Sequence, residues 1–204
     1  DAAVVHVSEL ADESAEEEER KLVAFRLCPS PKVVAVPRLL SAAEVAALLD
    51  LVPRELRGSP ANVGGPFSAA TRTLRSLAFG ETPLVETIEA RLVSTAGLGL
   101  GYLGQLRLVH PGTQLGLCNR GCGPKSVYVC LEDRDEVFFP RVGMRLMLGC
   151  GDTIMWPNVD WETGEAVEDI RTLRVHLGGG GASPVIGLDA FFHDNPLREQ
   201  QLQR

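Results

Sequence analysis

The sequence predicts an α+β domain in which two helices near the N-terminus support a β-sandwich or barrel. Two segments with apolar residues at helical spacing come first, and short apolar segments separated by glycine, proline and aspartate follow from Leu103 onward. Helices followed by strands favour helices packed on an antiparallel sandwich or barrel over a parallel sheet with alternating helices. The chain has 204 residues, 45% of them hydrophobic, which suffices for one domain with a complete core.

The charge balance disfavours several classes of partner. The formal net charge is -7, with 27 acidic and 20 basic residues, so the surface repels phosphate backbones and anionic lipid heads. No apolar run approaches the roughly 20 residues that cross a bilayer. We therefore expect a soluble protein with no nucleic-acid partner and no direct membrane insertion. The first residue is Asp1 rather than methionine, which fits a processed organellar or secretory-pathway precursor or a trimmed chain, so the compartment stays open.

The N-terminal segment is strongly acidic. Residues Glu16 to Glu19 form a run of four glutamates with few apolar neighbours, which is typical of a solvated arm. We therefore expect an acidic arm over residues 1–29 and a folded domain over residues 30–204. That domain is predicted to open with a short strand at 33–36, set between two prolines.

The first predicted helix has a clear start and a clear end. Ser41 followed three residues later by Glu44 makes a capping box, and Pro53 closes the segment. The stretch from Arg54 to Phe67 is rich in glycine and proline, so it is predicted to be a loop.

The second predicted helix begins with Thr82 as its cap and Pro83 at its first position, and it ends near Gly97. The strands predicted after it cover 106–109, 127–131, 144–148, 153–156, 172–177 and 185–192.

Six stretches, in the same order, resemble the catalytic domain of the prolyl 4-hydroxylases, which are iron and 2-oxoglutarate dependent dioxygenases. They are VVAVPRLLSAAEVAALLDLV (33–52), TPLVETIEARLVSTAGL (82–98), GQLRLVHPGTQLGLCNRG (104–121), EVFFP (136–140), GDTIMW (151–156) and IRTLRVHLGGGGASPVIGLDAFF (170–192). The resemblance covers roughly residues 30 to 192. It implies a double-stranded β-helix of the jelly-roll or cupin type, in which two facing antiparallel sheets are supported by the two N-terminal helices.

The resemblance breaks at the residues that carry the chemistry. Active relatives hold iron through a His-x-Asp motif and a distant histidine, which leaves open positions for 2-oxoglutarate and oxygen. In this sequence those three positions fall on Cys118, Arg120 and Arg174. The lysine that pairs with the far carboxylate of 2-oxoglutarate falls on Asp189, so its charge is reversed.

Arginine cannot replace a metal ligand, because it stays protonated and offers only hydrogen-bond donors. Two guanidinium groups would also repel a divalent cation by several kcal/mol, at an effective dielectric constant of about 20. We therefore expect no iron there. Arg120 and Arg174 are expected to pair with Asp189 or another carboxylate, with binding of an anion as the alternative. His176, two residues after Arg174, is the best remaining candidate for a metal ligand, although a structural role is favoured.

The cysteines do not indicate a disulfide framework or a zinc site. There are five, an odd number, and only Cys118 and Cys122 have close spacing, without a matching second pair. We expect buried, unreactive thiols.

Three functions follow from these observations. The favoured one is a catalytically inactive prolyl hydroxylase-like domain without cofactors. It would act as a structural or accessory subunit of a larger multi-subunit complex, or as a protein-binding module. The alternative is an active dioxygenase that uses Fe(II) and 2-oxoglutarate with non-standard ligands such as His176. The third is a small-anion binder at Arg120 and Arg174.

Overall fold

The computed structural model describes residues 3–10, 22–28, 32–57, 72–110, 125–140, 142–158, 173–174 and 186–197. Its helices are η1 (Val7–Leu10), α1 (Ala42–Asp50), α2 (Arg54–Arg57), α3 (Pro83–Ala96) and η3 (Leu100–Tyr102). Its strands are β1 (Ala3–His6), β2 (Phe25–Cys28), β3 (Val33–Val36), β4 (Arg72–Ser76), β5 (Arg107–His110), β6 (Lys125–Cys130), β7 (Asp135–Phe139), β8 (Met144–Leu148), β9 (Thr153–Pro157), β10 (Leu173–Arg174) and β11 (Gly187–Phe192).

The strands form two sheets. The larger has seven strands in the order β2-β3-β9-β6-β11-β5-β4, and the smaller has four in the order β1-β8-β7-β10. Every pairing is antiparallel except that of β1 with β8. Strands distant in sequence are neighbours at the centre of the large sheet, where β11 lies between β5 and β6.

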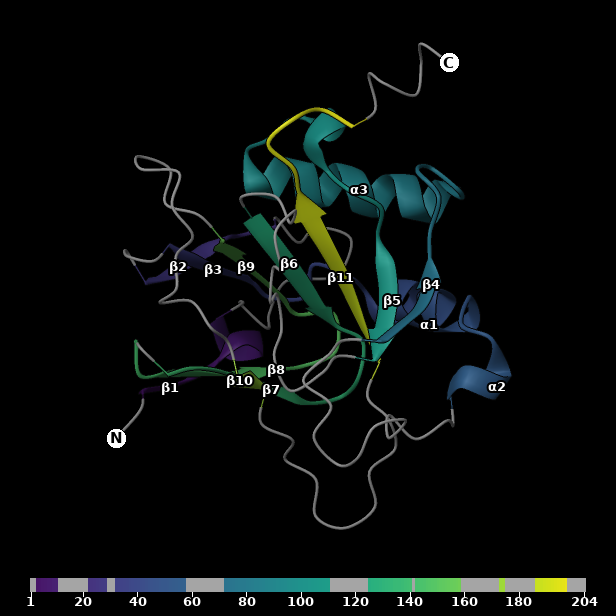
Figure 1. The fold of residues 1–204 in the computed structure, drawn as a ribbon. Coiled ribbons are helices and arrows are strands. Elements are labelled where there is room, and N and C mark those ends of the chain that lie inside the picture. The colour runs from purple at the N-terminus through teal and green to yellow at the C-terminus, as the bar shows by residue number, and fades with distance from the viewer. Residues whose placement is uncertain are drawn as a thin grey trace.

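Each face of the large sheet borders its own hydrophobic core. On one face, alternate strand residues pack with the apolar sides of α1 and α3, as with Leu188 and Ile88. On the other face, residues such as Tyr128 and Ile154 pack against the small sheet through Val137. In Figure 1 the small sheet lies below the central strands and α3 lies above them. The predicted α+β architecture of two facing sheets with supporting helices is confirmed.

Both predicted helices are confirmed with their caps. Ser41 and Glu44 form the complete capping box at the start of α1. The Thr82 side chain accepts a hydrogen bond from the Val85 amide at the start of α3. Gly97 ends α3 with φ of 67°, a left-handed conformation that glycine adopts without steric cost.

The structure corrects the prediction of an N-terminal arm over residues 1–29. Residues 3–6 form β1 at the edge of the small sheet, and residues 25–28 form β2 at the edge of the large sheet. Val7 is fully buried in the core between the sheets. Apolar residues at both ends of the acidic segment can join sheet edges, although the run Glu16 to Glu19 itself lies outside the described residues.

Two further elements depart from the predictions. The region predicted as a loop from Arg54 begins with the short helix α2, which continues the turn made by Pro53. Residues 72–76 form β4, which the sequence did not predict, at the free edge of the large sheet beside β5. The predicted strand at 172–177 is described only at 173–174, as β10.

A single carboxylate connects three distant segments of the fold. Asp152, which is fully buried, accepts hydrogen bonds from the Ser8 hydroxyl at 2.6 Å, the Gly149 amide at 2.8 Å and the Arg38 amide at 2.9 Å. These donors come from η1, from the turn before β9 and from the connection between β3 and α1. Asp152 therefore holds the N-terminal segment against the body of the domain.

None of the helices in the described ranges combines the length and the apolar character that a membrane-spanning helix requires.

We expect Asp152→Ala to destabilise the protein by about 2 to 4 kcal/mol, because it leaves three donors without their acceptor in a buried position. Urea unfolding at neutral pH measures this loss. The control is Asp133→Ala, which removes an exposed aspartate and should change the free energy of unfolding by no more than about 0.5 kcal/mol. Equal effects of the two substitutions would contradict the role given to Asp152.

Candidate functional site

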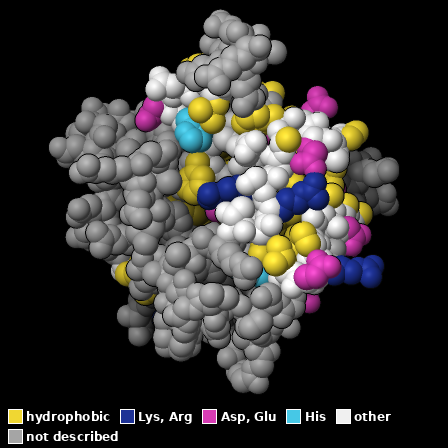
Figure 2. All heavy atoms as spheres, turned by 45° about the vertical axis from the view of Figure 1, so that its right-hand side comes forward, with side chains coloured by type: hydrophobic (Ala, Val, Ile, Leu, Met, Phe, Trp, Pro, Cys, Tyr) yellow, Lys and Arg dark blue, Asp and Glu magenta, His cyan; other side chains and the backbone are white. Residues whose placement is uncertain are grey.

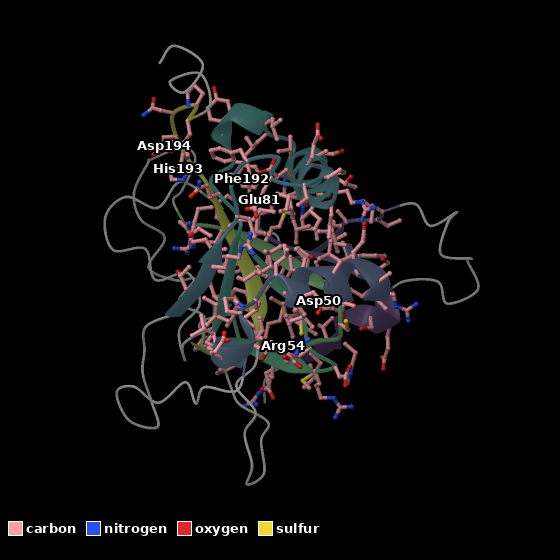
Figure 3. All side chains as sticks on the ribbon, turned by 90° about the vertical axis from the view of Figure 1, so that its right-hand side faces the viewer. Asp50, Arg54, Glu81, Phe192, His193 and Asp194 are labelled. Atoms are coloured by element: carbon pink, nitrogen blue, oxygen red, sulfur yellow. The ribbon has the colours of Figure 1, made fainter. Side chains whose placement is uncertain are left out.

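The candidate site lies on the face of β11 that points toward the small sheet. Leu188, Ala190 and Phe192 belong to the core shared with the helices. Because successive strand residues point to opposite faces, Gly187, Asp189 and Phe191 face the space between the sheets. Figure 3 marks Phe192 at the end of this strand, where the chain continues into His193 and Asp194.

Asp189 forms a two-point ion pair with Arg107 on the neighbouring strand β5. The two residues are directly opposite each other in the register of β5 and β11. Arg107 Nε donates to Asp189 Oδ1 at 2.8 Å, and Arg107 Nη2 donates to Asp189 Oδ2 at 2.7 Å. Such a bidentate pair is stronger and more directional than a single charged contact.

Phe191 provides a second contact for the same guanidinium group. The Cζ atom of Arg107 lies 4.8 Å from the centroid of the Phe191 ring, within the range of a cation–π interaction. The Asp189 side chain is 11% exposed and that of Arg107 is 34% exposed. The carboxylate is thus nearly enclosed, whereas the guanidinium still reaches solvent.

Burial raises the pKa of the Asp189 carboxyl above its ordinary value of 3.8. The hydrogen bonds and the positive charge of Arg107 oppose this rise. The raised pKa means that the free-energy cost of removing the carboxylate from water exceeds the stabilisation that Arg107 gives to its charged form.

Tyr128 fills the space next to Asp189. It lies opposite Asp189 on β6, and its hydroxyl donates to Asp135 Oδ2 at 2.6 Å. A Cβ atom added at Gly187 would lie 2.4 Å from Tyr128 Cε2, so the ring is seated directly on the glycine backbone. The inner face of β11 is therefore occupied by side chains of the protein itself.

The other site residues predicted from the sequence are placed only in part. Cys118, Arg120 and His176 lie outside the described residues. Arg174 lies on β10, where its backbone pairs with Val137 of β7. The predicted pairing of Arg120 and Arg174 with Asp189 or another carboxylate involves side chains that the structure does not describe. The partner of Asp189 that the structure describes is Arg107.

The described residues contain no group of three or more side chains suited to holding a metal ion. Since Cys118, Arg120 and His176 are not among them, the predicted metal positions stay untested. His110, which precedes Cys118 in the same predicted segment, is buried on the helix side of the sheet, with Nε2 3.1 Å from the Leu56 carbonyl oxygen.

Comparison with solved structures identifies the class of fold. The chain resembles a viral collagen prolyl hydroxylase from Paramecium bursaria Chlorella virus-1 in complex with 2OG, with a TM-score of 0.60 and 12% identity over 81% of this chain and 97% of that chain. A truncated form of the viral enzyme matches with a TM-score of 0.55 and 13% identity over 90% of this chain and 99% of that chain. Family models and curated protein sequences yield no match. The chain therefore has the double-stranded β-helix fold of the 2-oxoglutarate oxygenases, as predicted.

The described residues do not fit 2-oxoglutarate at the position that the sequence resemblance assigns to its far carboxylate. A carboxylate ligand needs a cation or several donors there, and the protein presents the Asp189 carboxylate instead. Both oxygens of Asp189 accept hydrogen bonds from Arg107, so the edge of the guanidinium group formed by Nε and Nη2 is already occupied.

Sequence reasoning located Asp189 but missed the residues that surround it. Arg107 lies between Leu106 and Leu108, which are both fully buried. This alternation places a charge on the opposite face of a central strand, where burial demands a partner. The identity of that partner depends on the register between β5 and β11, which the sequence pattern does not specify.

We expect Arg107→Met to destabilise the protein by about 2 to 4 kcal/mol, because it leaves the Asp189 carboxylate buried without a counter-charge. The double variant Arg107→Met/Asp189→Leu should recover most of this loss, since two apolar side chains of similar size replace the pair. Urea unfolding of both variants measures the coupling. Arg26→Met on the exposed strand β2 is the control and should have little effect. Additive effects of the two site substitutions would contradict the pairing.

The same variant predicts a change in pH dependence. Since folding raises the pKa of Asp189, its protonated form contributes stability that is complete below the ordinary pKa and is lost as pH rises through the folded-state value. Without Arg107 the folded-state pKa of Asp189 rises further, so the stability that is lost as pH rises becomes larger. The stability gap between wild type and Arg107→Met should therefore narrow between about pH 7 and about pH 5, measured by unfolding at each pH. A gap that is constant or widens on acidification would argue against a buried Asp189 charge.

Proposed function

We propose that this chain is a catalytically inactive prolyl hydroxylase-like domain that uses no iron and no 2-oxoglutarate. It serves as a structural or accessory subunit, or as a protein-binding module, within an assembly of several proteins. The fold is that of the oxygenases, whereas the residue at the expected co-substrate position has the opposite charge.

The observation that carries this proposal is the bidentate pair between Asp189 and Arg107. A co-substrate carboxylate placed against Asp189 meets a like charge in a nearly enclosed position, where water screens little of the repulsion. Turning Arg107 toward such a ligand breaks two charge-assisted hydrogen bonds and leaves Asp189 buried and unpaired. Both routes oppose binding at this position.

The packing of Tyr128 on Gly187 supports the same conclusion. The aromatic ring takes the room beside the Asp189 side chain, and the bond from its hydroxyl to Asp135 holds it in place. A ligand entering between the sheets would have to displace this ring from a fully buried site. The space has thus become part of the hydrophobic core.

The role that remains for such a domain is binding other proteins. The net charge of -7 favours partners with basic or uncharged surfaces over nucleic acid. On the face in Figure 2, the described Lys and Arg side chains lie apart from one another, some of them beside Asp or Glu side chains, and do not merge into a basic patch.

We expect no turnover when the purified chain is incubated with Fe(II), ascorbate and 2-oxoglutarate. Succinate formation, followed by NMR with and without a proline-rich peptide, should equal that of a matched sample containing EDTA. Iron content after removal of excess metal should stay far below one ion per chain. Stoichiometric iron together with succinate formation above the EDTA sample would establish the alternative, an active dioxygenase with non-standard ligands such as His176.

A further inference from the structure

The ion pair with Asp189 uses only one edge of the Arg107 guanidinium group. A guanidinium carries five N–H donors, arranged so that one edge presents Nε with Nη2 and another presents Nη1 with Nη2. Asp189 takes the first edge through Nε and Nη2. Among the described residues, Nη1 of Arg107 donates no hydrogen bond, so the second edge keeps its pair of parallel donors.

Arg107 is the more exposed member of the pair. Its side chain is 34% exposed, while that of Asp189 is 11% exposed. Asp189 along one edge and the Phe191 ring across one face hold the group in a fixed orientation. A ligand therefore meets donors that are already ordered, which lowers the entropy lost on binding.

We propose that this outer edge of Arg107 is a binding site for a carboxylate group. Two parallel N–H donors match the two oxygens of a carboxylate. The ligand would touch the guanidinium group directly, whereas Asp189 lies on the opposite side of it, so attraction acts over a shorter distance than repulsion. Binding at this edge leaves both hydrogen bonds between Arg107 and Asp189 in place.

The carboxylate has two possible sources, an acidic residue or C-terminus of a partner protein and a free small acid. The inference rests on the proposed function, because it treats the carboxylate as part of a ligand that binds and is not chemically changed. The test below uses no iron and no 2-oxoglutarate, so its outcome is independent of the turnover measurement.

Arg145 offers a matched control. It lies on β8, its Cζ is also 4.8 Å from an aromatic centroid, that of Phe138, and its side chain is 41% exposed. Its carboxylate partner Glu136, however, accepts from a single nitrogen, Nη1. The two arginines thus share stacking and exposure but differ in how the guanidinium group is held.

The experiment compares sodium acetate with sodium chloride at equal ionic strength and neutral pH, in the presence of EDTA. With a dissociation constant on the order of 30 mM, 100 mM acetate should raise the Tm by about 2 °C over chloride. Arg145→Lys should keep this difference and Arg107→Lys should lose it. In the wild type, the Nε–Hε NMR signal of Arg107 should shift with acetate and saturate, a measurement that does not depend on whether the Arg107 variant folds.

A second titration identifies the source of the carboxylate. N-acetyl-aspartate amide is compared with N-acetyl-asparagine amide, which has the same shape without the charge. A response to the aspartate compound and to acetate supports a site open to partner proteins, and a response to acetate alone supports one limited to small acids. No saturable shift of the Arg107 signal, equal effects of acetate and chloride, or loss of the acetate effect in Arg145→Lys would overturn the proposal.

Discussion

The central strands of the large sheet are covered on both faces, and this constraint acts on the charged side chains placed on them. Water does not reach these positions freely, so a charge or hydroxyl group there must find its partner inside the protein. Asp189 meets the requirement through Arg107, and Tyr128 meets it through Asp135. Asp152, at the start of β9, does so through three donors from separate segments. These charged and hydroxyl groups therefore have partners inside the protein, whereas the buried Thr153 hydroxyl on β9 has none among the described residues.

This constraint also explains why a carboxylate at position 189 involves residues beyond its own strand. A negative group on β11 is tolerated because β5 supplies an arginine directly opposite it in the register. The arginine in turn gains an aromatic contact from Phe191 on the same strand as the carboxylate. Three side chains on two strands thus form a unit whose internal charge is balanced.

Much of the architecture was predictable because local signals and the fold agree. Helix-end signals involve only residues that are close in sequence. The structure has all three that were predicted, the capping box at Ser41, the threonine cap at Thr82 and the glycine at Gly97. The strand at 144–148 was predicted at its observed bounds, since alternate apolar residues mark it clearly.

The missed elements have little local signal. The edge strand β4 is rich in polar residues and lacks a buried alternation, and β1 and β2 are four residues long and flank an acidic run. In the site, the sequence resemblance located Asp189, but its partner Arg107 was not predicted. The choice of Arg107 depends on long-range strand register, which the periodicity of a single strand does not contain.

The parallel pairing of β1 with β8 bears on how the protein behaves when it is shortened. β8, with the sequence MRLML, would otherwise be a free edge next to β7. An uncovered strand of this kind offers unpaired amides and apolar side chains to other molecules and is a template for intermolecular β-pairing. Residues 3–6 shield that edge, and the Ser8 hydroxyl secures the shield by its bond to Asp152. This N-terminal segment thus protects the protein against self-association. A recombinant form that lacks it would tend to aggregate.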